Sequence, residues 1–287
     1  MDVAGILLNY NTRQDVIRLA TSLSALEGIV PLVVDNSSDV TLQTWCVDNN
    51  VQYEDTCSNL GYTGGNNVGL RAAMQEGFEY AFILNPDIEI KSLDIAGMIE
   101  ILDRGNADIL FPKVHDVDGG MQNDVPTTEN RVLRFGGELP SLPESNDKRL
   151  RYVDHGPGSA MMLRLDMLDD IGYLREEFFM YGEEVELCYR ARRAEYRVAI
   201  YRCSEVLHDH PKPEMWMSKF RMYYNVRNKF LRNKLLFGYS LIYSALILAY
   251  LAKYIQKIIS KRTWELLQPM VLGIYDGLRL KTGRGRY

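Results

Sequence analysis

Strand-like and helical segments alternate regularly over the first hundred residues, and this alternation restricts the fold more than any other feature. The segments with the length and composition of buried strands are residues 2–9, 30–36, 51–55 and 79–85. Helical patterns separate them, one running from the N-cap candidate Thr12 to about Leu26 and another covering 67–76. Strands that alternate with helices of about 10–15 residues predict βαβ units. We therefore expect an α/β protein with a mostly parallel sheet flanked by helices.

The pattern changes after Phe111. Residues 115–156 contain two glycine pairs, three prolines and many charges, which predicts long loops with short strands. Regular segments return with strands at 158–165 and 196–202 and a helix from about Glu183 to Ala194. The 287 residues are enough for one large α/β domain with an appendage.

The C-terminal part of the chain differs sharply from the rest in charge. Residues 211–287 carry fifteen Lys or Arg and three acids, a net charge of +12, whereas the preceding 210 residues carry −17. The uncharged run 235–252 just reaches the roughly 18 residues that permit a membrane span, but its Tyr and Ser suit a membrane interface. We expect a basic, partly apolar helical region that lies on an anionic membrane face. A helix packed on the body or on a second subunit is the alternative.

The remaining compositional features favour an ordinary folded, intracellular protein. The chain is 46% hydrophobic and 25% charged, which is typical of a folded protein. Its first residues, Met1–Asp2, do not resemble a signal peptide, and its four cysteines show no CxxC spacing. We expect reduced, mostly buried thiols and a cytoplasmic protein.

Polar residues follow the predicted strands, at the edge of the sheet where ligands of α/β proteins bind. In "NPDIE", residues 85–89, Asp87 and Glu89 supply oxygen ligands suited to a hard divalent cation that also binds a diphosphate. The same letters also describe a plain turn. In "VLHDHP", residues 206–211, His208 and His210 are further metal-ligand candidates, and a structural role is the alternative.

The segment "NLGYTGGNNVGLRAA", residues 59–73, reads as a glycine-rich loop that leads into a helix. Backbone N–H groups at Gly61, Gly64 and Gly65 are candidates to approach a phosphate. The glycine spacing is not GxGxxG and no Walker lysine follows, so a nicotinamide oxidoreductase and a P-loop enzyme are disfavoured. A purely structural loop is the other interpretation.

The segment "FFMYGEEVELCYRARR", residues 178–193, places an aromatic patch against two acids that open a helix. Favourable interaction with the helix dipole is the simple explanation of Glu183 and Glu184. A carboxylate that is partly desolvated by rings and also held at a helix N-terminus would instead suit proton abstraction from a hydroxyl. Glu186 and Arg190 are spaced as an i,i+4 ion pair.

The order of these segments resembles the family 2 inverting glycosyltransferases with the GT-A fold. It runs "LLNYN", "VVDNSSD", "SNLGYTGGNNVG", "FILNPDIEI", "GSAMMLR", "FFMYGEEVELCYRARR" and "YYNVRNKFL", across residues 3–230. Within the family the chain looks most similar to bacterial rhamnosyltransferases of surface polysaccharide synthesis. The resemblance implies a GT-A catalytic domain over 1–210, with a nucleotide-sugar-binding half (1–110) and an acceptor half (111–210), followed by the helical region 211–287.

The resemblance also implies residue roles. Glu184 matches the catalytic base, which is more often Asp in the family, and Glu183 precedes it on the acceptor side with the rings of Phe179 and Tyr181. Asn85-Pro86-Asp87 matches the metal-binding DxD motif; because Asn85 replaces its first acid, metal binding rests more heavily on Asp87, and His208 falls where relatives supply a further ligand. The positions that match donor nucleotide-binding residues are Tyr10, Asp35, Asn59, Gly61, Asn67 and Asn85.

The implied reaction is the Mn²⁺- or Mg²⁺-dependent transfer of a sugar from a nucleoside diphosphate to a glycan or lipid-linked acceptor. dTDP-rhamnose is the favoured donor, and UDP-galactose, UDP-galactofuranose or another UDP-hexose are alternatives. Peripheral association with the inner face of the cell membrane is implied, and no nucleic-acid partner is expected. A homo-oligomer stays open. A non-catalytic nucleotide-sugar-binding scaffold is the competing function, although a scaffold needs neither the paired acids nor the DxD-like turn.

Overall fold

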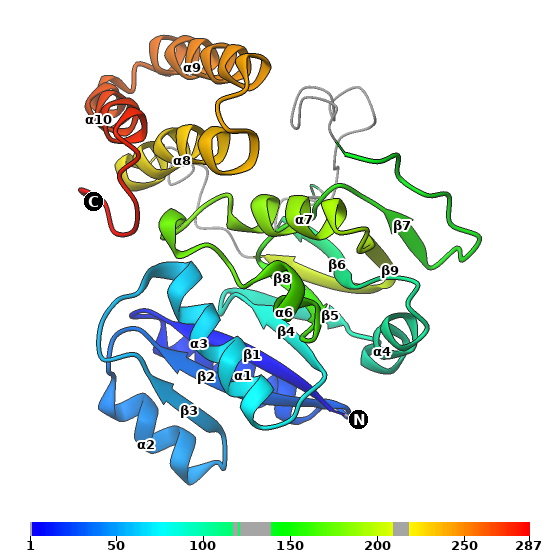
Figure 1. The fold of residues 1–287 in the computed structure, drawn as a ribbon. Helices are drawn as coiled ribbons and strands as arrows, with labels where there is room; N and C mark the ends of the chain where they lie inside the picture. The colour runs from blue at the N-terminus through cyan, green and yellow to red at the C-terminus, as the bar shows by residue number, and fades with distance from the viewer. Residues whose placement is uncertain (1, 117–119, 121–138, 209–217) are drawn as a thin grey trace.

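A computed structural model describes residues 2–116, 120, 139–208 and 218–287. Their core is a nine-stranded sheet in the order β3-β2-β1-β4-β8-β6-β9-β5, with β7 paired to β9 (Figure 1). The strands are β1 (Val3–Asn9), β2 (Ile29–Asp35), β3 (Gln52–Asp55), β4 (Tyr80–Leu84), β5 (Ile88–Ser92), β6 (Ile109–Asp116), β7 (Leu150–Tyr152), β8 (Ala160–Arg164) and β9 (Val198–His208). The helices are α1 (Arg13–Ser24), α2 (Val40–Asp48), α3 (Gly61–Gln75), α4 (Ile95–Asp103), α6 (Met167–Ile171), α7 (Glu183–Arg193), α8 (Lys219–Phe237), α9 (Leu241–Lys261) and α10 (Leu267–Leu278).

The first four strands form the parallel half of the sheet, as the alternation predicts. Strand β1 pairs in parallel with β2 and β4, and β2 pairs in parallel with β3. Beyond β4 the sheet is mixed, because β8 runs antiparallel to both β4 and β6 while β9 runs parallel to β6. The four parallel strands end at one edge, which brings together the polar residues that follow them.

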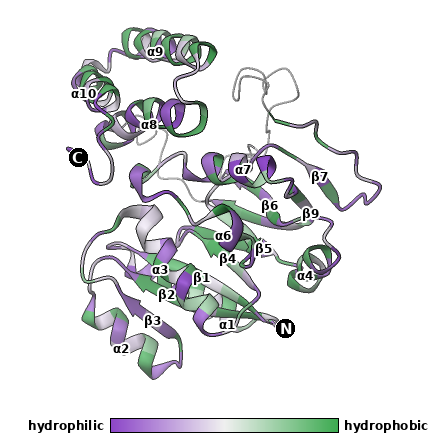
Figure 2. Cartoon of the chain, in the orientation of Figure 1, coloured by the Kyte–Doolittle hydropathy of each residue, from purple (hydrophilic) through white to green (hydrophobic). Residues whose placement is uncertain are grey.

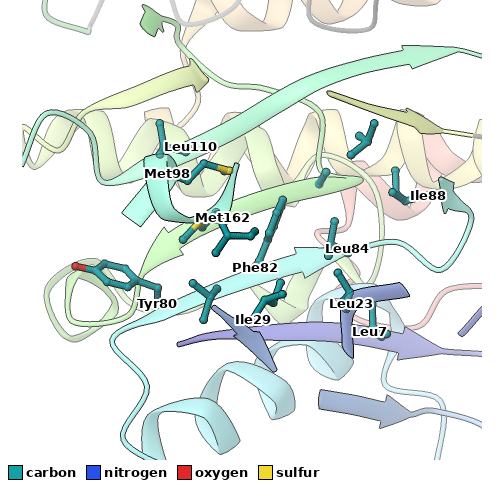
Figure 3. Packing of buried hydrophobic residues seen from close by; sticks show 14 of the residues in the cluster. Leu7, Leu23, Ile29, Tyr80, Phe82, Leu84, Ile88, Met98, Leu110 and Met162 are labelled. Carbon is teal, nitrogen blue, oxygen red and sulfur yellow. The ribbon is translucent and has the colours of Figure 1, made fainter. Parts of the chain in front are cut away.

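Both faces of the sheet are covered, which explains why its central strands are apolar throughout. On β4, Phe82 and Leu84 enter a cluster with residues of α1, α2 and α4, whereas Ala81 and Ile83 enter a second cluster with residues of α3, α6 and α7. Figure 3 shows the first cluster around Phe82. The hydropathy colouring agrees, with hydrophobic strands inside and hydrophilic segments at their ends and on outer helix faces (Figure 2).

The glycine-rich segment is helical, which corrects the expectation of a loop. Helix α3 begins at Gly61, so Gly64 and Gly65 lie inside its first turns. A Cβ at Gly65 would lie 2.4 Å from Leu8 Cδ1, and one at Gly69 would lie 2.6 Å from Ile6 Cγ2. These two glycines therefore serve the close approach of α3 to the sheet, and their N–H groups belong to a helix.

Two smaller expectations also need correction. Thr12 does precede α1, but its side chain makes no capping bond; instead Asn9 Oδ1 accepts hydrogen bonds from Thr12 N and Oγ1. The apolar run 235–252 is not one helix, because α8 ends at Phe237 and Gly238 adopts a left-handed conformation before α9 begins. Residues 117–119 and 121–138 of the predicted loop region, and His210, lie outside the described residues.

The C-terminal helices form a layer of their own beside the sheet (Figure 1). Met222 and Val226 of α8 pack against Met270 of α10 and Ile258 of α9. Within the described part of the chain, α9 is the one helix that is long and apolar enough to cross a membrane, by length and composition alone. Only 17% of its most apolar window is buried inside the protein.

Candidate active site

A cavity of about 800 Å³ lies between the polar edge of the sheet and the C-terminal helices. Its walls come from the turn after β4, the loop before β8, the first turn of α7, the end of β9, and helices α8 and α9. Glu184 and Asp87, which are 97 residues apart in sequence, both line it, together with Glu183 and His208. These four residues belong to three separate motifs of the sequence, and the fold brings them to one cavity.

A strained turn presents the two acids at the start of α7. Phe179, Tyr181 and Gly182 all have positive φ angles, of 63°, 72° and 92°. Glycine is favoured at the last of these positions, because residues with a Cβ rarely adopt a φ of 92°. The chain therefore reverses just before α7, so Glu183 and Glu184 become the first two residues of that helix and lie at the cavity wall.

Helix α8 holds this turn in place from the other side. The buried Asn228 donates from Nδ2 to the carbonyl oxygens of Met180 and Tyr181, at 2.7 and 2.9 Å. Arg227, which is fully buried, donates from Nη2 to Phe178 O at 2.6 Å and from Nη1 to Gly283 O at 2.7 Å. Arg227 belongs to the basic region expected at a membrane face, but its charge is satisfied by backbone carbonyls inside the protein.

The two adjacent glutamates differ in environment. Glu183 is 5% exposed and its Oε2 is buried without a hydrogen-bond partner. Burial, and secondly the charge of Glu184, raise the pKa of Glu183 well above its usual value. Glu184 is half-buried and faces the cavity. Because Glu183 is held towards its neutral form, the helix start does not have to carry two full negative charges side by side.

Asp87 and His208 meet at the end of β4. Strand β5 pairs with β9 so that Ile88 lies opposite His208, which brings the His208 ring next to Asp87. Asp87 Oδ1 lies 3.1 Å from His208 Nε2, yet this buried oxygen accepts no well-aligned hydrogen bond. Asn85 also lines the cavity, and its backbone N–H donates to Ser159 O at 2.8 Å. Glu89, the other acid of this motif, is not at the cavity; it pairs with Lys91 on β5.

Tyr62 marks how closely the acids approach one another. Its hydroxyl donates to Gly158 O at 2.6 Å, and its ring lines the cavity. Burial raises the pKa of Tyr62 well above its usual value, and the charges of Glu183, Glu184 and Asp87 raise it further. Three carboxyl groups from two separate motifs therefore all raise the pKa of the Tyr62 hydroxyl.

Two of the nucleotide-binding candidates, Tyr10 and Asp35, lie at the ends of β1 and β2, outside this cavity. Tyr10 follows β1 and is 48% exposed. Asp35 ends β2 and is fully buried, where it accepts hydrogen bonds from the side chains of Asn9 and Tyr53 and from the backbone of Asp39, with distances of 2.6–2.8 Å. Burial by itself would raise the pKa of Asp35, but the hydrogen bonds that it accepts lower it. The carboxylate thus organises the loop after β2.

The three candidates on or near α3, Asn59, Gly61 and Asn67, all take part in hydrogen bonds within the protein. Asn59 accepts a hydrogen bond from Gly61 N through its Oδ1 at 2.9 Å. Asn67 is buried and exchanges hydrogen bonds with the backbone of Leu174 at 2.8 and 3.1 Å. Asn67 lines a second cavity of about 440 Å³ with Arg71, apart from the cavity of Asp87 and Glu184. The Asn67 amide ties α3 to the segment before α7, and its role near the donor stays a prediction.

Of the aromatic residues expected to form an acceptor wall, the structure separates Phe179 from Tyr181. Phe179 is 4% exposed and stacks on Tyr224 of α8, with ring centroids 5.4 Å apart. Tyr181 does line the cavity, with the Arg221 guanidinium 5.5 Å from its ring centroid. Phe179 does not line this cavity because its ring packs against α8, and its acceptor-side role stays a prediction.

One set of cavity residues was not anticipated. Helix α8 contributes three cations to the cavity lining: Arg221, Lys229 and Arg232. The charge pattern of the sequence predicts a membrane surface for this basic region. The helical spacing of these residues was a usable signal, but nothing in the sequence states which way that helical face points.

Comparisons with known proteins identify relatives of this chain. No family model matches the chain. It is 34% identical, over 99% of its length and 93% of the relative, to the low-salt glycan biosynthesis hexosyltransferase of Haloferax volcanii. It is 25% identical, over 100% and 98%, to the dTDP-rhamnosyl transferase RfbF of Shigella flexneri.

Among solved structures, the chain resembles S. aureus TarS 1–349 in complex with UDP-GlcNAc. The TM-score is 0.59 at 17% identity, with 98% of this chain and 82% of that chain covered. GalNAc-T7 with UDP, GalNAc and Mn²⁺ gives a TM-score of 0.54 at 14% identity, over 79% of this chain and 47% of that one. These likenesses show the fold, and the Haloferax relative shows the family. The chain belongs to the family 2 glycosyltransferases, enzymes of GT-A fold that transfer a sugar from a nucleotide-sugar donor.

Proposed function

We propose that this enzyme is a metal-dependent, inverting glycosyltransferase in which Glu184 is the catalytic base. The observation that carries the proposal is that Glu184 and Asp87 line the same cavity of about 800 Å³. A base on one motif and a cation-binding acid on another must flank one sugar for a direct displacement. A cavity between them supplies the space for that sugar.

Glu184 is suited to the proton transfer. A sugar hydroxyl is a poor nucleophile at neutral pH, so a base must remove its proton as the oxygen attacks the anomeric carbon. The new glycosidic bond forms while the bond to the nucleoside diphosphate breaks, and configuration inverts in that single displacement. Glu183, which is held towards its neutral form by burial, does not compete as a second base; it limits the negative charge beside Glu184.

Asp87 and His208 fit a hard divalent cation such as Mn²⁺ or Mg²⁺. Asp87 Oδ1 is buried without a well-aligned hydrogen bond, and it lies 3.1 Å from His208 Nε2. A carboxylate oxygen suits such a cation, and an imidazole nitrogen is a common further metal ligand, so these two residues would hold it. No group of three or more His, Cys, Asp or Glu gathers for a metal among the residues that the structure describes. Diphosphate oxygens and water would therefore complete the shell, and the cation would stabilise charge on the leaving diphosphate.

The donor nucleotide would bind beside this cavity, along the ends of β1 and β2. Tyr10 is exposed there, and Asp35 holds the following loop through its internal hydrogen bonds. We propose that the base contacts Tyr10 and the loop that Asp35 organises, with Asn59 and Gly61 forming the adjacent start of α3. Asn85, at the cavity, would lie between the base and the diphosphate.

The donor sugar is proposed as rhamnose or a hexose. The 25% identical relative is named a dTDP-rhamnosyl transferase, which supports dTDP-rhamnose. The 34% identical relative is named a hexosyltransferase, which supports UDP-galactose or another UDP-hexose. A thermal-shift panel of these nucleotide sugars, with and without Mn²⁺, separates them, because a ligand of the native state raises the melting temperature by mass action.

We also propose that α9 rests on the inner face of the cell membrane, where it would meet a lipid-linked acceptor. Leu241 and Leu248 are 86% and 67% exposed, and Lys253, Lys257 and Lys261 follow on the same helix. An exposed apolar stripe with nearby lysines binds anionic bilayers. Packing against a second copy of the chain is the alternative occupant of this face.

The direct test of the mechanism is Glu184→Gln. We expect transfer to fall by about 10²–10⁴-fold, the usual contribution of a positioned general base. Binding of UDP or dTDP with Mn²⁺ should be retained, since Glu184 does not touch the nucleotide in this proposal. Glu184→Asp, which restores the residue type more common in the family, is the matched variant and should keep part of the activity. Equal turnover by Glu184→Gln and the unmodified enzyme would refute the assignment.

A further inference from the structure

Gly158 and Ser159, which precede strand β8, lie between the proposed base and the proposed cation-binding motif. On one side, Ser159 O accepts a hydrogen bond from the backbone N–H of Asn85 at 2.8 Å, two residues before Asp87. On the other side, a Cβ placed on Gly158 would lie 3.3–3.6 Å from Cβ, Cγ and Cδ of Glu184. The Glu184 side chain therefore packs against Gly158. All five residues line the cavity.

The backbone of this dipeptide is held in place by its neighbours. Gly158 O accepts a hydrogen bond from the Tyr62 hydroxyl at 2.6 Å. The next residue after Ser159, Ala160, is already part of the sheet, where it pairs with Leu84 of β4. The position of the Ser159 Cα is therefore determined by the sheet, and its hydroxyl can move only by rotation of the side chain.

The Ser159 hydroxyl is buried and has no partner in the protein. Ser159 is 6% exposed, and its Oγ forms no hydrogen bond with any residue that the structure describes. Three other buried atoms of cavity residues share this condition: Asp87 Oδ1, Glu183 Oε2 and Arg232 Nε. A buried hydroxyl without a partner destabilises the free protein. Such a group is completed by a bound water or by a ligand.

The position of this hydroxyl favours a sugar as its partner. In a single displacement, the reacting carbon of the sugar lies between the attacking oxygen and the leaving diphosphate. Glu184 and Asp87 are the residues proposed to act at these two ends, and Ser159 lies between them. A serine hydroxyl both donates and accepts, so it can pair with the neutral hydroxyl of a sugar. The polar atom without a partner and the space for the sugar thus coincide.

We propose that Ser159 is a specificity-determining residue whose hydroxyl makes a hydrogen bond with a hydroxyl group of the transferred sugar. This inference rests on the proposed function and deepens it, because it names a residue that recognises the sugar part of the donor. A site that is built to bind a substrate hydroxyl rejects an analogue lacking it, because the buried group of the protein then stays unpaired.

Calorimetric titration of the full chain with saturating Mn²⁺ and no acceptor tests the proposal. The ligands are UDP-galactose or dTDP-rhamnose, whichever binds the unmodified chain more tightly, and the corresponding nucleotide without its sugar. Ser159→Ala removes the hydroxyl, and Ser159→Cys replaces it with a poor hydrogen-bonding group of similar size. The matched control is Thr263→Val, because the Thr263 hydroxyl is also buried without a partner among the described residues but lies outside the cavity.

The expected loss is specific to the sugar. Both Ser159 variants should bind the nucleotide sugar about three- to tenfold more weakly, the usual contribution of one uncharged hydrogen bond. Their affinity for UDP or dTDP alone should stay within about twofold, and Thr263→Val should change neither affinity. Deoxy analogues of the sugar then identify the partner: with the analogue that lacks the contacted hydroxyl, Ser159→Ala should show no further loss.

Melting curves without ligand separate binding from folding. Ser159→Ala and Thr263→Val should melt no earlier than the unmodified chain, since each removes a buried hydroxyl that has no protein partner. A lower melting temperature for Ser159→Ala would show that the hydroxyl has a structural partner and would overturn the inference.

Two binding results also overturn the inference. An equal loss for the nucleotide and the nucleotide sugar would assign the Ser159 hydroxyl to the diphosphate or the cation, and no loss for either would assign it to a water molecule. If the unmodified chain binds neither UDP nor dTDP, the proposed function itself fails, and this result is distinct from both.

Discussion

The sheet-based body is acidic and the C-terminal region is basic, and the structure shows that residues of both line one cavity. The first 210 residues carry −17 and the last 77 carry +12. From sequence this split suggests an acidic enzyme with a basic anchor. In the structure, acids of the body and cations of α8 line the same cavity. The C-terminal region, which the charge pattern marks as an appendage, therefore contributes to the walls of the site.

The two regions also deliver their site residues differently. The body places Asp87 and Glu184 at the end of a strand and at the start of a helix, so the hydrogen-bonded sheet determines where they lie. The C-terminal region places its residues on one helical face, so side-chain packing determines where they point. Four predictions, from the largest expected effect to the smallest, test this comparison.

The Asp87→Asn substitution should remove the proposed cation-binding carboxylate of the body while keeping the size and shape of the side chain. We expect transferase activity at fixed Mn²⁺ to fall by about a hundredfold, because an uncharged ligand stabilises the leaving diphosphate less well. Activity measured across a Mn²⁺ titration checks this. Glu89→Gln is the matched control, since this neighbouring acid pairs with Lys91 away from the cavity. A metal dependence unchanged in Asp87→Asn would remove Asp87 from the metal site.

The Asn228→Ala variant tests whether the C-terminal region holds the turn before α7 in place. The Asn228 amide donates to the carbonyl oxygens of Met180 and Tyr181. Loss of these buried bonds should cost about 2 kcal/mol of unfolding free energy, and activity should fall because Glu184 is less well positioned. Denaturant unfolding and steady-state kinetics measure the two effects. Lys234→Ala, an exposed change on the same helix, should alter neither; if Asn228→Ala also alters neither, α8 does not control the turn.

Glu183→Gln should stabilise the protein at neutral pH. Because the folded-state pKa of Glu183 is raised, this residue contributes stability that is complete below its unfolded pKa of about 4.5 and declines as pH rises towards the folded value. Each unit by which the folded-state pKa exceeds the unfolded pKa corresponds to about 1.4 kcal/mol of unfolding free energy. Unfolding free energies of both chains at pH 4 and pH 8 check the sign. A variant that is less stable than the unmodified chain at pH 8 would contradict the buried, neutral glutamate.

Leu248→Ser/Ile255→Ser should reduce binding to anionic vesicles with little effect on stability, because both side chains are exposed on α9. We expect a loss of about 2 kcal/mol or less in partitioning free energy, in line with the apolar area removed. Vesicle sedimentation measures it. Val47→Ser, an exposed apolar change on α2 of the body, is the control. Should the double variant instead convert a dimer to a monomer with vesicle binding unchanged, α9 is a subunit interface.

Much of the fold was predictable because it depends on local patterns. Strands β1, β2 and β4 begin and end within two residues of the predicted segments. The acids at the start of α7 were also recognised, since a helical pattern and its first turn are both local. Glu186 and Arg190 form the expected i,i+4 pair, with Glu186 fully buried rather than at the surface.

The direction in which these side chains point was not predictable from the sequence. Asn67 sits in a motif that resembles a donor loop, but α3 turns it towards Leu174. Phe179 and Tyr181 belong to one aromatic patch, and of these two only Tyr181 lines the cavity. Gly65 was a candidate of a phosphate-binding loop, but it lies inside α3, where a Cβ would lie 2.4 Å from Leu8 Cδ1. Each of these outcomes depends on a neighbour far away in sequence.

By itself, the sequence determined the α/β alternation, the order of the family motifs and the unequal distribution of charge, because each of these is written in neighbouring residues. Only the tertiary structure decided that Asp87 and Glu184 share a cavity, that Arg227 is buried, and that cations of α8 line the same cavity. The physical reason is that a helix has several faces. Which of them is buried depends on the surfaces it packs against, and those surfaces come from distant parts of the chain.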